Sequence, residues 1–482
     1  MTLPLRTARF ASLGDTYYSA VRVQPLRAAR WAAFSPGTAA LLGLDMAQLA
    51  SDEALHLCNG VVASSVTPLA MVYSGHQFGS YNPRLGDGRA MLLGEIGHAG
   101  RVHEIQLKGA GMTPYSRQGD GRAVLRSSIR EFLCSEAMHG LGIPTTRALA
   151  LIASEEPVYR EQVETGAMVL RVSPSHIRFG SFEYFFYTRQ HDALQQLADF
   201  VIEHHYPEAL RHENRYAAFL QAVVTRTARL MAHWQAAGFA HGVMNTDNMS
   251  ILGETFDYGP FGFLDDYNPQ FICNHSDYNG RYAYDQQPSI GLWNCNALAH
   301  ALSPLVPVET LREILHSYQP TIEQQYLQLM RAKLGLHTAQ AADNALIGQL
   351  LGLLQQSAVD YTIFFRRLCD FVADAPNPGL RDLFVDREGF DRWSNQYSIR
   401  LAAEQSRDGE RSTRMKQANP KYILRNYLAQ QAIDKAQREQ DFSEVNNLLR
   451  VLQDPFAEHP EQEHYAAFPP DWGKRLEISC SS

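Results

Sequence analysis

A segment near the middle of the chain carries residues suited to phosphoryl or nucleotidyl transfer. It runs from His241 to Gly259 and reads HGVMNTDNMSILGETFDYG. Within it, Asn248 offers an amide oxygen, and Asp257, nine residues later, offers a carboxylate. Magnesium keeps several of its waters when it binds a protein, so one or two oxygen ligands are enough to hold it. We therefore predict that Asn248 and Asp257 bind a divalent metal ion, Mg²⁺ or Mn²⁺.

A lysine and a glutamate upstream of this segment are spaced to form an ion pair. Lys108 ends the β-prone run VHEIQLKG, and Glu131 lies 23 residues later in a helical segment. A strand lysine in this position can contact nucleotide phosphates while a helix glutamate holds it in place. Alone, Lys108 would be an ordinary lysine at the end of a strand. The prediction therefore depends on the metal-binding segment that follows.

The spacing around Asn248 is typical of the catalytic loop of protein kinases, in which H-x-D precedes an asparagine that lies five residues after the aspartate. His241 and Asn248 fit this register, but Val243 stands where the catalytic aspartate would be. FDYG then puts Asp257 at the position of the metal-binding aspartate of D-F-G. Val243 therefore indicates either an inactive enzyme or a different reaction.

Long blocks of sequence resemble the selenoprotein O family, kinase-fold proteins that transfer AMP from ATP to Ser, Thr or Tyr hydroxyls of proteins. They cover nearly the whole chain and include YSGHQFG, LGDGRA, LKGAGMTPYSRQGDGRAVLRSSIREFL, GIPTTRAL, SHIRFGSFE and the CSS ending. The resemblance implies that ATP binds in an inverted orientation compared with kinases. It also implies ATP as the substrate and Mg²⁺ or Mn²⁺ as the metal.

The resemblance further assigns roles to individual residues of this sequence. Asp247 would be the base that takes the proton from the acceptor hydroxyl, and Asn248 and Asp257 would hold the metal. The residues expected to bind the nucleotide, most of them through its phosphates, are Gly86, Gly88, Arg89, Lys108, Asp120, Gly121, Arg171, Arg178 and Asp257.

The chemistry of the two arginines agrees with an inverted nucleotide. Arg171 and Arg178 follow the last β-prone run, where a kinase has the hinge that lines its adenine slot. Guanidinium groups bind a polyphosphate better than they line a slot for adenine. An inverted nucleotide would put its γ-phosphate on these arginines and its α-phosphorus beside the metal. The alternative is that both arginines form salt bridges at the surface or between lobes.

Other conspicuous residues have simpler structural explanations. His76 of YSGHQFG and His241 are expected to make structural hydrogen bonds. Asp265 and Asp266 are expected to shape a turn or a helix start rather than to bind a second metal. The aromatic side chains of FEYFFY, residues 182–187, are expected in the core.

The resemblance also implies a possible redox device. Cys480 occupies the position of selenocysteine in some relatives, and Cys273 lies where a kinase has its activation loop. A disulfide between them would close the C-terminal tail over that loop. In a reducing compartment such a bond would be regulatory rather than structural.

The predicted elements place these residues in two lobes. Four β-prone runs with turn-like flanks predict a small sheet, at residues 90–96, 102–109, 148–154 and 166–172. Between the second and third runs, apolar spacing predicts a helix that ends near Gly140 and Pro144. From about residue 190 the pattern becomes helical, including a long helix over 214–238 with Gly238 as its C-cap.

The expected fold class is therefore α+β, a protein-kinase-like two-lobed fold with extra C-terminal helices. The expected units are a β-rich N-terminal lobe over 1–175, a helical C-terminal lobe with the catalytic and metal-binding loops over 176–400, and a helical extension with a Cys-containing tail over 401–482.

Composition limits the classes of partner and compartment. The 482 residues are 45% apolar and 20% charged, with a net charge of -8, which argues against general nucleic-acid binding. The six cysteines lack CxxC spacing, so a structural zinc site is not expected. No run approaches the length of a membrane span, and the start lacks the apolar core of a secretory signal. We expect a cytoplasmic monomer with protein substrates and no nucleic-acid or membrane partner, with an organellar presequence as the alternative.

The leading functional prediction is a protein adenylyltransferase that releases pyrophosphate. The alternatives are uridylyl transfer from UTP with Mn²⁺, an ordinary phosphotransferase, and a nucleotide-binding pseudokinase that acts as a scaffold. If the protein binds an inverted nucleotide mainly through its phosphates, it need not recognise the base closely. UTP therefore stays an alternative substrate.

Overall fold

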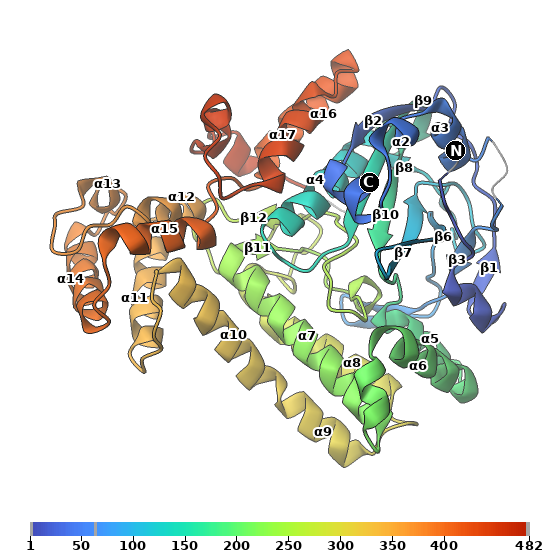
Figure 1. The fold of residues 1–482 in the computed structure, drawn as a ribbon, viewed down its shortest axis with the longest axis horizontal. Helices are drawn as coiled ribbons and strands as arrows, with labels where there is room; N and C mark the ends of the chain where they lie inside the picture. The colour runs from blue at the N-terminus through green and yellow to red at the C-terminus, as the bar shows by residue number, and fades with distance from the viewer. Residues whose placement is uncertain (1–2, 62–64, 479–482) are drawn as a thin grey trace.

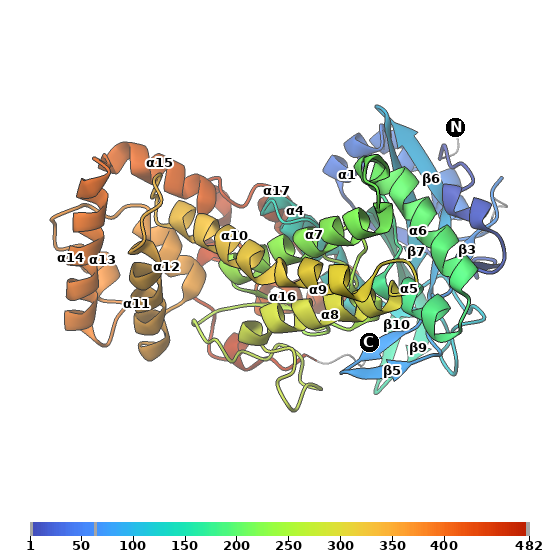
Figure 2. The same cartoon turned by 90° about the horizontal axis from the view of Figure 1, so that it is seen from below.

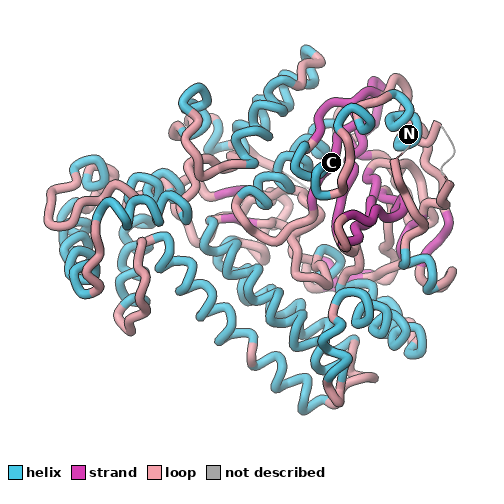
Figure 3. The backbone as a smooth tube through the Cα atoms, viewed as in Figure 1, coloured by secondary structure: helices cyan, strands magenta, loops and turns pink. Residues whose placement is uncertain are grey.

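The computed structural model describes residues 3–61 and 65–478 and has an α+β architecture (Figure 1). The strands of the main sheet come first in the chain and the long helices come second, as predicted. Most of the strands gather on one side of the molecule (Figure 3). The main sheet has eight strands in the order β1-β3-β6-β7-β10-β9-β2, with β8 paired to β10. Their bounds are β1 Tyr18–Ala20, β2 Arg30–Phe34, β3 Leu69–Met71, β6 Ala90–His98, β7 Arg101–Lys108, β8 Ala123–Val124, β9 Arg147–Tyr159 and β10 Val163–Ser173.

All four predicted β-prone runs are confirmed as strands β6, β7, β9 and β10. In β10, Val169 belongs to the core cluster on the face of α4, whereas Leu170 belongs to the cluster on the opposite face. Side chains alternate between the two faces of a strand, so Arg171 points to the same face as Val169. This alternation directs Arg171 toward α4 and the residues that α4 carries.

Short helices cover the other face of the sheet. They are α1 Pro36–Leu41, α2 Met46–Leu49 and α3 Asp52–Cys58. Leu42, Leu49 and Leu55 from this region pack with Leu170 of β10 in one buried cluster. The sheet is therefore covered on both faces, which explains why its central strands read as nearly continuous apolar runs.

The predicted helix between the second and third runs is α4, Leu125–Gly140. Ile129, Phe132 and Leu133 are fully buried, as their helical spacing predicts. The helix ends at Gly140, and the chain turns back through Gly142, whose φ is +73°. Because α4 packs on β9 and β10, residues of its inner face reach the end of β7, where Lys108 lies.

The second half of the chain is helical. Its first helices are α5 Phe179–Tyr187, α6 His191–His205, α7 Arg215–Ala237, α8 Gln287–Ala301, α9 Val308–His316 and α10 Tyr318–Lys333, of which α8, α9 and α10 pack on α7 (Figure 2). The prediction for the longest of them is confirmed: Asn214 caps the N-terminus of α7 through Ala217 N–H, and Gly238 ends it at φ +69°.

The last helices divide between two places. Helices α11 Asp343–Gln356, α12 Tyr361–Leu368, α13 Pro378–Arg381, α14 Arg387–Ala403 and α15 Asp408–Ala418 form a group at one end of the molecule, with a core of its own (Figure 1). Helices α16 Asn426–Glu439 and α17 Ser443–Gln453 return to pack on α4. Within the described ranges, no helix combines the length and apolarity needed to cross a membrane.

Two small hairpins complete the elements that surround the site. Strands β4 Gly75–Gln77 and β5 Ser80–Asn82 pair with each other, and so do β11 Phe239–Ala240 and β12 Gly262–Phe263. The loop between β11 and β12 contains the whole metal-binding segment predicted from the sequence. Its two ends are therefore fixed to each other by strand pairing.

Candidate active site

A cavity of about 550 Å³ brings the predicted site residues together. All eleven of them line it: Gly86, Gly88, Arg89, Lys108, Asp120, Gly121, Arg171, Arg178, Asp247, Asn248 and Asp257. They come from the sheet, from two glycine-rich loops, from the N-cap of α5 and from the loop between β11 and β12. Their gathering in one cavity is observed, and their individual roles remain predictions.

The predicted ion pair between Lys108 and Glu131 is confirmed. Lys108 Nζ lies 2.5 Å from Glu131 Oε2, and both side chains are buried. Burial lowers the pKa of Lys108 to about 8, although Glu131 opposes this shift. Burial raises the pKa of Glu131, but Arg171 and Lys108 outweigh that effect and hold it below its ordinary value. The strand lysine is thus fixed at the floor of the cavity.

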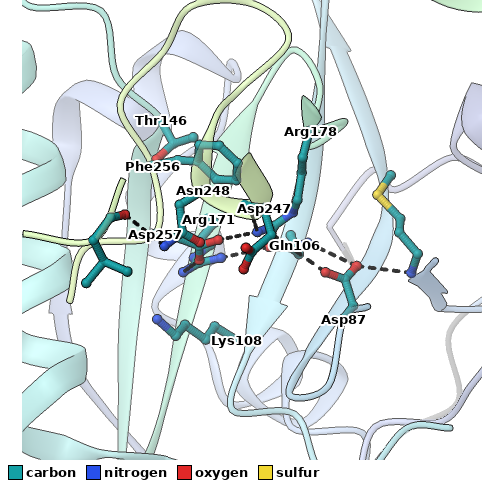
Figure 4. Close-up of polar contacts among 12 residues, drawn as sticks. Asp87, Gln106, Lys108, Thr146, Arg171, Arg178, Asp247, Asn248, Phe256 and Asp257 are labelled. Carbon is teal, nitrogen blue, oxygen red and sulfur yellow. Dashed lines mark hydrogen bonds and ion pairs between the residues drawn. The ribbon is translucent and has the colours of Figure 1, made fainter. Parts of the chain in front are cut away.

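Arg171 extends this ion pair into a network with Asp257. Its Nε also contacts Glu131 Oε1, and its Nη2 lies 2.6 Å from Asp257 Oδ1. Arg178, the N-cap residue of α5, contacts the other oxygen of Asp257 through its Nη1 (Figure 4). Burial would raise the pKa of Asp257, but the two arginines and Lys108 hold it well below its ordinary value. Asp257 is therefore ionised and clamped between two guanidinium groups.

Both explanations given for the two arginines are compatible with this geometry. Arg171 and Arg178 are almost fully buried and form salt bridges, as the alternative explanation requires. They also line the cavity, where their remaining N–H groups can bind an anion. An anionic ligand would compete with Asp257 for the two arginines. The Asp257 carboxylate would then be released from its contacts with them.

The chemistry of Asn248 and Asp257 fits a magnesium ion. Asn248 Nδ2 donates a hydrogen bond to the carbonyl of Val243 at 3.1 Å, which turns the amide and leaves its Oδ1 as the ligand atom. Asp257 adds an ionised carboxylate and adopts a left-handed backbone with φ +59°. The described residues contain no group of three or more His, Cys, Asp and Glu side chains that could hold a metal. A metal here would therefore need oxygens from a nucleotide or from water, as Mg²⁺ commonly has.

Asp247 lies beside Asn248 in a 3₁₀ turn, Thr246–Asn248, and is buried. Burial raises its pKa to about 7, although Arg178 opposes this shift. Its Oδ2 accepts a hydrogen bond from Gln77 Nε2 at 3.3 Å. Its Oδ1 is buried and accepts none from the part of the chain that the structure describes. A carboxylate with one unsatisfied oxygen in a cavity is suited to accept a proton from a ligand.

The structural hydrogen bonds predicted for the two histidines are confirmed. His241 Nε2 lies 3.0 Å from the carbonyl of Phe256, and its Nδ1 accepts from Val243 N–H at 3.3 Å. The neutral ring thus ties the catalytic loop to the residue before Asp257. His76 Nδ1 lies 2.5 Å from Glu183 Oε1, on helix α5.

Glycine is required in both glycine-rich loops because they approach residues 109–117 closely. A Cβ atom at Gly86, whose φ is +111°, would lie 2.5 Å from Tyr115 Cγ. A Cβ atom at Gly121, whose φ is +70°, would lie 2.1 Å from the carbonyl oxygen of Gly111. The two copies of GDGRA therefore line the same cavity, and both pack against the segment 109–117 that lies between them in the sequence.

Sequence reasoning missed three arginines of the cavity wall, Arg117, Arg122 and Arg160. Arg160 makes a two-pronged ion pair with the predicted Asp120, with distances of 2.8 and 2.9 Å. Arg122 stands in the second GDGRA where Arg89 stands in the first, so a comparison of the two copies would have found it. With these three, seven cationic side chains and four aspartates line the cavity.

Of the two structural roles expected for Asp265 and Asp266, a helix start is wrong, whereas Asp265 does lie in a bend of the chain. Asp265 contacts Arg425, and Asp266 Oδ1 lies 2.7 Å from Lys474 Nζ. Both partners come from the C-terminal part of the chain, so local sequence could not reveal them. The pair serves to attach that part to the β12 region.

The aromatic side chains of FEYFFY are only partly in the core. Phe182 and Phe185 of α5 are buried, as expected. Tyr187 is 40% exposed and packs close to Tyr81 of β5. Tyr187 therefore contacts the small hairpin, whereas Tyr184 and Phe186 are partly buried against the core.

The disulfide between Cys273 and Cys480 remains a prediction because Cys480 lies outside the described residues. Cys273 is buried, and its Sγ lies 3.4 Å from the carbonyl of Ala240. The N–H of His275 donates to the carbonyl of Ile478 at 2.8 Å. The chain therefore passes close to the loop of Cys273 two residues before Cys480.

Comparison with known proteins agrees with this geometry. The family model described as Protein adenylyltransferase SelO matches residues 3–453. A protein of Vibrio cholerae named Protein nucleotidyltransferase YdiU is 56% identical over 482 residues, which cover 98% of each chain. Proteins of the same name from Stutzerimonas stutzeri and Pseudomonas paraeruginosa are each 55% identical over 98% of both chains. The chain therefore belongs to the SelO family, the selenoprotein O family that its motifs resemble.

Proposed function

We propose that this protein is an adenylyltransferase that moves AMP from ATP to Ser, Thr or Tyr hydroxyls of proteins. Asp247 takes the proton of the acceptor hydroxyl, and the acceptor oxygen attacks the α-phosphorus of ATP. The bond from the α-phosphorus to its bridging oxygen breaks, and pyrophosphate leaves. The observation that carries this proposal is that Asp247, with its unsatisfied Oδ1, shares one cavity with Lys108, Arg171 and Arg178. Membership in the SelO family supports the same class of reaction.

The fold proposed for this reaction is kinase-like, with two lobes over 1–175 and 176–400 and an extension over 401–482. Three features support it: a lysine at the end of a central strand, its glutamate on the adjacent helix, and the paired Asn248 and Asp257 on one loop. The two arginines lie deep in the cavity and suit the terminal phosphates of an inverted nucleotide.

The metal, Mg²⁺ or Mn²⁺, would be held by Asn248 and Asp257. It would neutralise charge on the nucleotide phosphates and help to orient the α-phosphorus. Before it binds, Asp257 must give up its contacts with Arg171 and Arg178. The nucleotide's own phosphates can take over these arginines, so binding of ATP and metal is expected to be mutually dependent.

Uridylyl transfer is the second candidate, and one observation favours it. Seven cationic side chains line the cavity, so most of the affinity for a nucleotide can come from its phosphates. Such a site discriminates weakly between adenine and uracil. The name that the related proteins carry, protein nucleotidyltransferase, covers both reactions.

Labelled nucleotides test the proposal directly. Purified protein is incubated with a mixed protein acceptor and ATP labelled on either the α- or the γ-phosphate, with Mg²⁺ or Mn²⁺, and α-labelled UTP in parallel. We expect α-label from ATP on the acceptor, release of pyrophosphate, and at least about 100-fold less transfer by Asp247→Ala. Transfer of γ-label would identify a phosphotransferase. Faster labelling from UTP would identify a uridylyltransferase, and nucleotide binding without labelling would identify a scaffold.

A further inference from the structure

The hairpin formed by β4 and β5 is attached to the catalytic loop by several hydrogen bonds. The N–H of His76 donates to Thr246 Oγ1 at 2.7 Å, and the N–H of Phe78 donates to Asn245 Oδ1 at 3.1 Å. Phe78 has a left-handed backbone, with φ +50°, at the turn of the hairpin. The hairpin and the residues just before Asp247 therefore form one rigid unit.

A chain of side-chain amides runs through this hairpin to Asp247. The N–H of Arg84 donates to Asn82 Oδ1 at 3.0 Å, and Asn82 Nδ2 donates to Gln77 Oε1 at 3.2 Å. Gln77 Nε2 in turn donates to Asp247 Oδ2 at 3.3 Å. A backbone N–H can only donate, so it fixes which end of the Asn82 amide faces Gln77. Because Asn82 Nδ2 donates to Gln77 Oε1, the other end of the Gln77 amide, Nε2, faces Asp247.

The other oxygen of Asp247 packs against the same hairpin. A Cβ atom at Gly75 would lie 2.9 Å from Asp247 Oδ1, so the absence of a side chain at this position lets the carboxylate lie close to the hairpin backbone. Oδ1 is buried and accepts no hydrogen bond from any described residue. The hairpin thus contacts both carboxylate oxygens of Asp247, Oδ2 through the Gln77 amide and Oδ1 through Gly75.

We propose that Gln77 is a positioning residue for transfer and that Asn82 acts through it. The Gln77 amide, oriented by Asn82, holds Asp247 by Oδ2 and thereby fixes the carboxylate that takes the proton of the acceptor hydroxyl. This inference rests on the proposed function, because it assumes that Asp247 is the base. It adds a specific role for the YSGHQFG segment, in which Gln77 lies 170 residues before Asp247 in the chain.

Removing the amide donor tests the proposal. Gln77→Met keeps the length of the side chain but cannot donate to Asp247. Because a hydrogen bond to a charged group is worth more than a neutral one, we expect kcat for AMP transfer to fall about 10- to 100-fold. KM for ATP and the Kd of a non-hydrolysable ATP analogue should change less than about two-fold, since the phosphate-binding side chains are untouched.

Reversing the amide chain gives a second variant. In Asn82→Asp, no donor faces Gln77 Oε1, so the Gln77 amide turns and presents its oxygen to Asp247. We expect a loss of kcat similar to that of Gln77→Met, and little further loss when both changes are combined, because both act through one contact. Ser80→Asp is the matched control. It adds the same charge to β5 at an exposed position and should keep kcat within about two-fold of the wild type.

The outcomes separate this inference from the proposed function. If Asp247→Ala retains transfer, Asp247 is not the base and both proposals fail. If Asp247→Ala is inactive but Gln77→Met keeps its kcat, only the role of Gln77 is refuted. A purely structural role would instead lower the unfolding temperature and raise KM for ATP together with the loss of kcat, and it would make the losses of the two single variants additive.

Discussion

Val243 contributes to the site through its backbone rather than through its side chain. Its carbonyl accepts the Asn248 amide at 3.1 Å, and its N–H donates to His241 Nδ1 at 3.3 Å. Both contacts hold the loop whatever side chain stands at this position. Asp247, the proposed proton acceptor, lies four residues further along the loop, where burial raises the pKa of its carboxyl to about 7.

This arrangement predicts the result of Val243→Asp. The variant should not gain transfer of γ-phosphate from ATP, because the nucleotide is expected to place its α-phosphorus, not its γ-phosphorus, near the loop. AMP transfer should fall, since a further carboxylate beside Asp247 and Asp257 repels the phosphates. The measurement is transfer of α- and γ-label to a protein acceptor.

Val243→Asn is the matched control for that variant, because it has nearly the same shape without the charge. It should lose less AMP transfer than Val243→Asp. Efficient γ-phosphoryl transfer by Val243→Asp would show that the loop has been misinterpreted and that the nucleotide is not inverted.

At the level of elements, α4 connects the cavity to the C-terminal helices. Its inner face brings Glu131 to Lys108, and five residues later Glu136 makes a two-pronged ion pair with Arg147, at 2.8 and 2.7 Å. Gln453, the last residue of α17, donates to Glu136 Oε2 at 3.1 Å. The C-terminal helix therefore supports the helix that positions the ion pair of the site (Figure 1).

Gly140 allows α17 to approach α4, which gives a second prediction. A Cβ atom at Gly140 would lie 2.1 Å from the carbonyl oxygen of Leu452, and backbone atoms of α17 would have to move. Gly140→Ala should lower the free energy of unfolding by about 1–3 kcal/mol. Urea denaturation measures this change, and transfer activity should fall with it because α4 carries Glu131.

Gly348 offers a matched control in another helix. It is an exposed residue of α11, and a Cβ atom added there would have no neighbouring atom within 4 Å. Gly348→Ala should raise the free energy of unfolding by about 0.5–1 kcal/mol, since alanine favours a helix over glycine. Equal effects of the two substitutions would mean that α17 does not need close contact with α4.

At the level of the whole molecule, α10 joins two separate cores. Tyr318 and Ile322 in its first half belong to the core beside the sheet, and Met330 near its end belongs to the core of α11–α15. Lys333, its last residue, is buried over the rings of Phe365 and Tyr361, at 4.4 and 5.2 Å. No carboxylate among the described residues forms an ion pair with it.

Burial lowers the pKa of Lys333 from 10.5 to about 7, so its contribution to stability depends on pH. Between these values the unfolded chain binds more protons than the folded one, and stability therefore rises with pH. Lys333→Met removes this dependence. It should raise the free energy of unfolding by about 4 kcal/mol more at pH 6 than at pH 10.

Denaturant titrations at several pH values test this prediction. Lys416→Met on α15 is the control, because that lysine is 41% exposed and its substitution should have a small effect at every pH. A gain from Lys333→Met that does not vary with pH would show that packing, not charge, is responsible.

The sequence alone determined the local features of this protein. Alternation and apolar spacing predicted β6, β7, β9, β10 and α4, because these patterns follow from which faces of a strand or helix are buried. Gly238 predicted the C-terminus of α7, because glycine readily adopts the left-handed conformation that ends a helix. The spacing of Lys108 and Glu131 predicted their ion pair, since a strand and the next helix pack together.

Only the tertiary structure decided which distant residues meet. Arg171 and Arg178 bind Asp257, Asp265 and Asp266 bind cations of the C-terminal part, and Gln77 reaches Asp247 across 170 residues. These contacts depend on how whole elements pack against one another. From the sequence alone, many other charged or polar side chains could have been the partners of these residues. Local propensity carries no information about that choice, because burial of apolar surface and satisfaction of buried charges are settled over the entire chain at once.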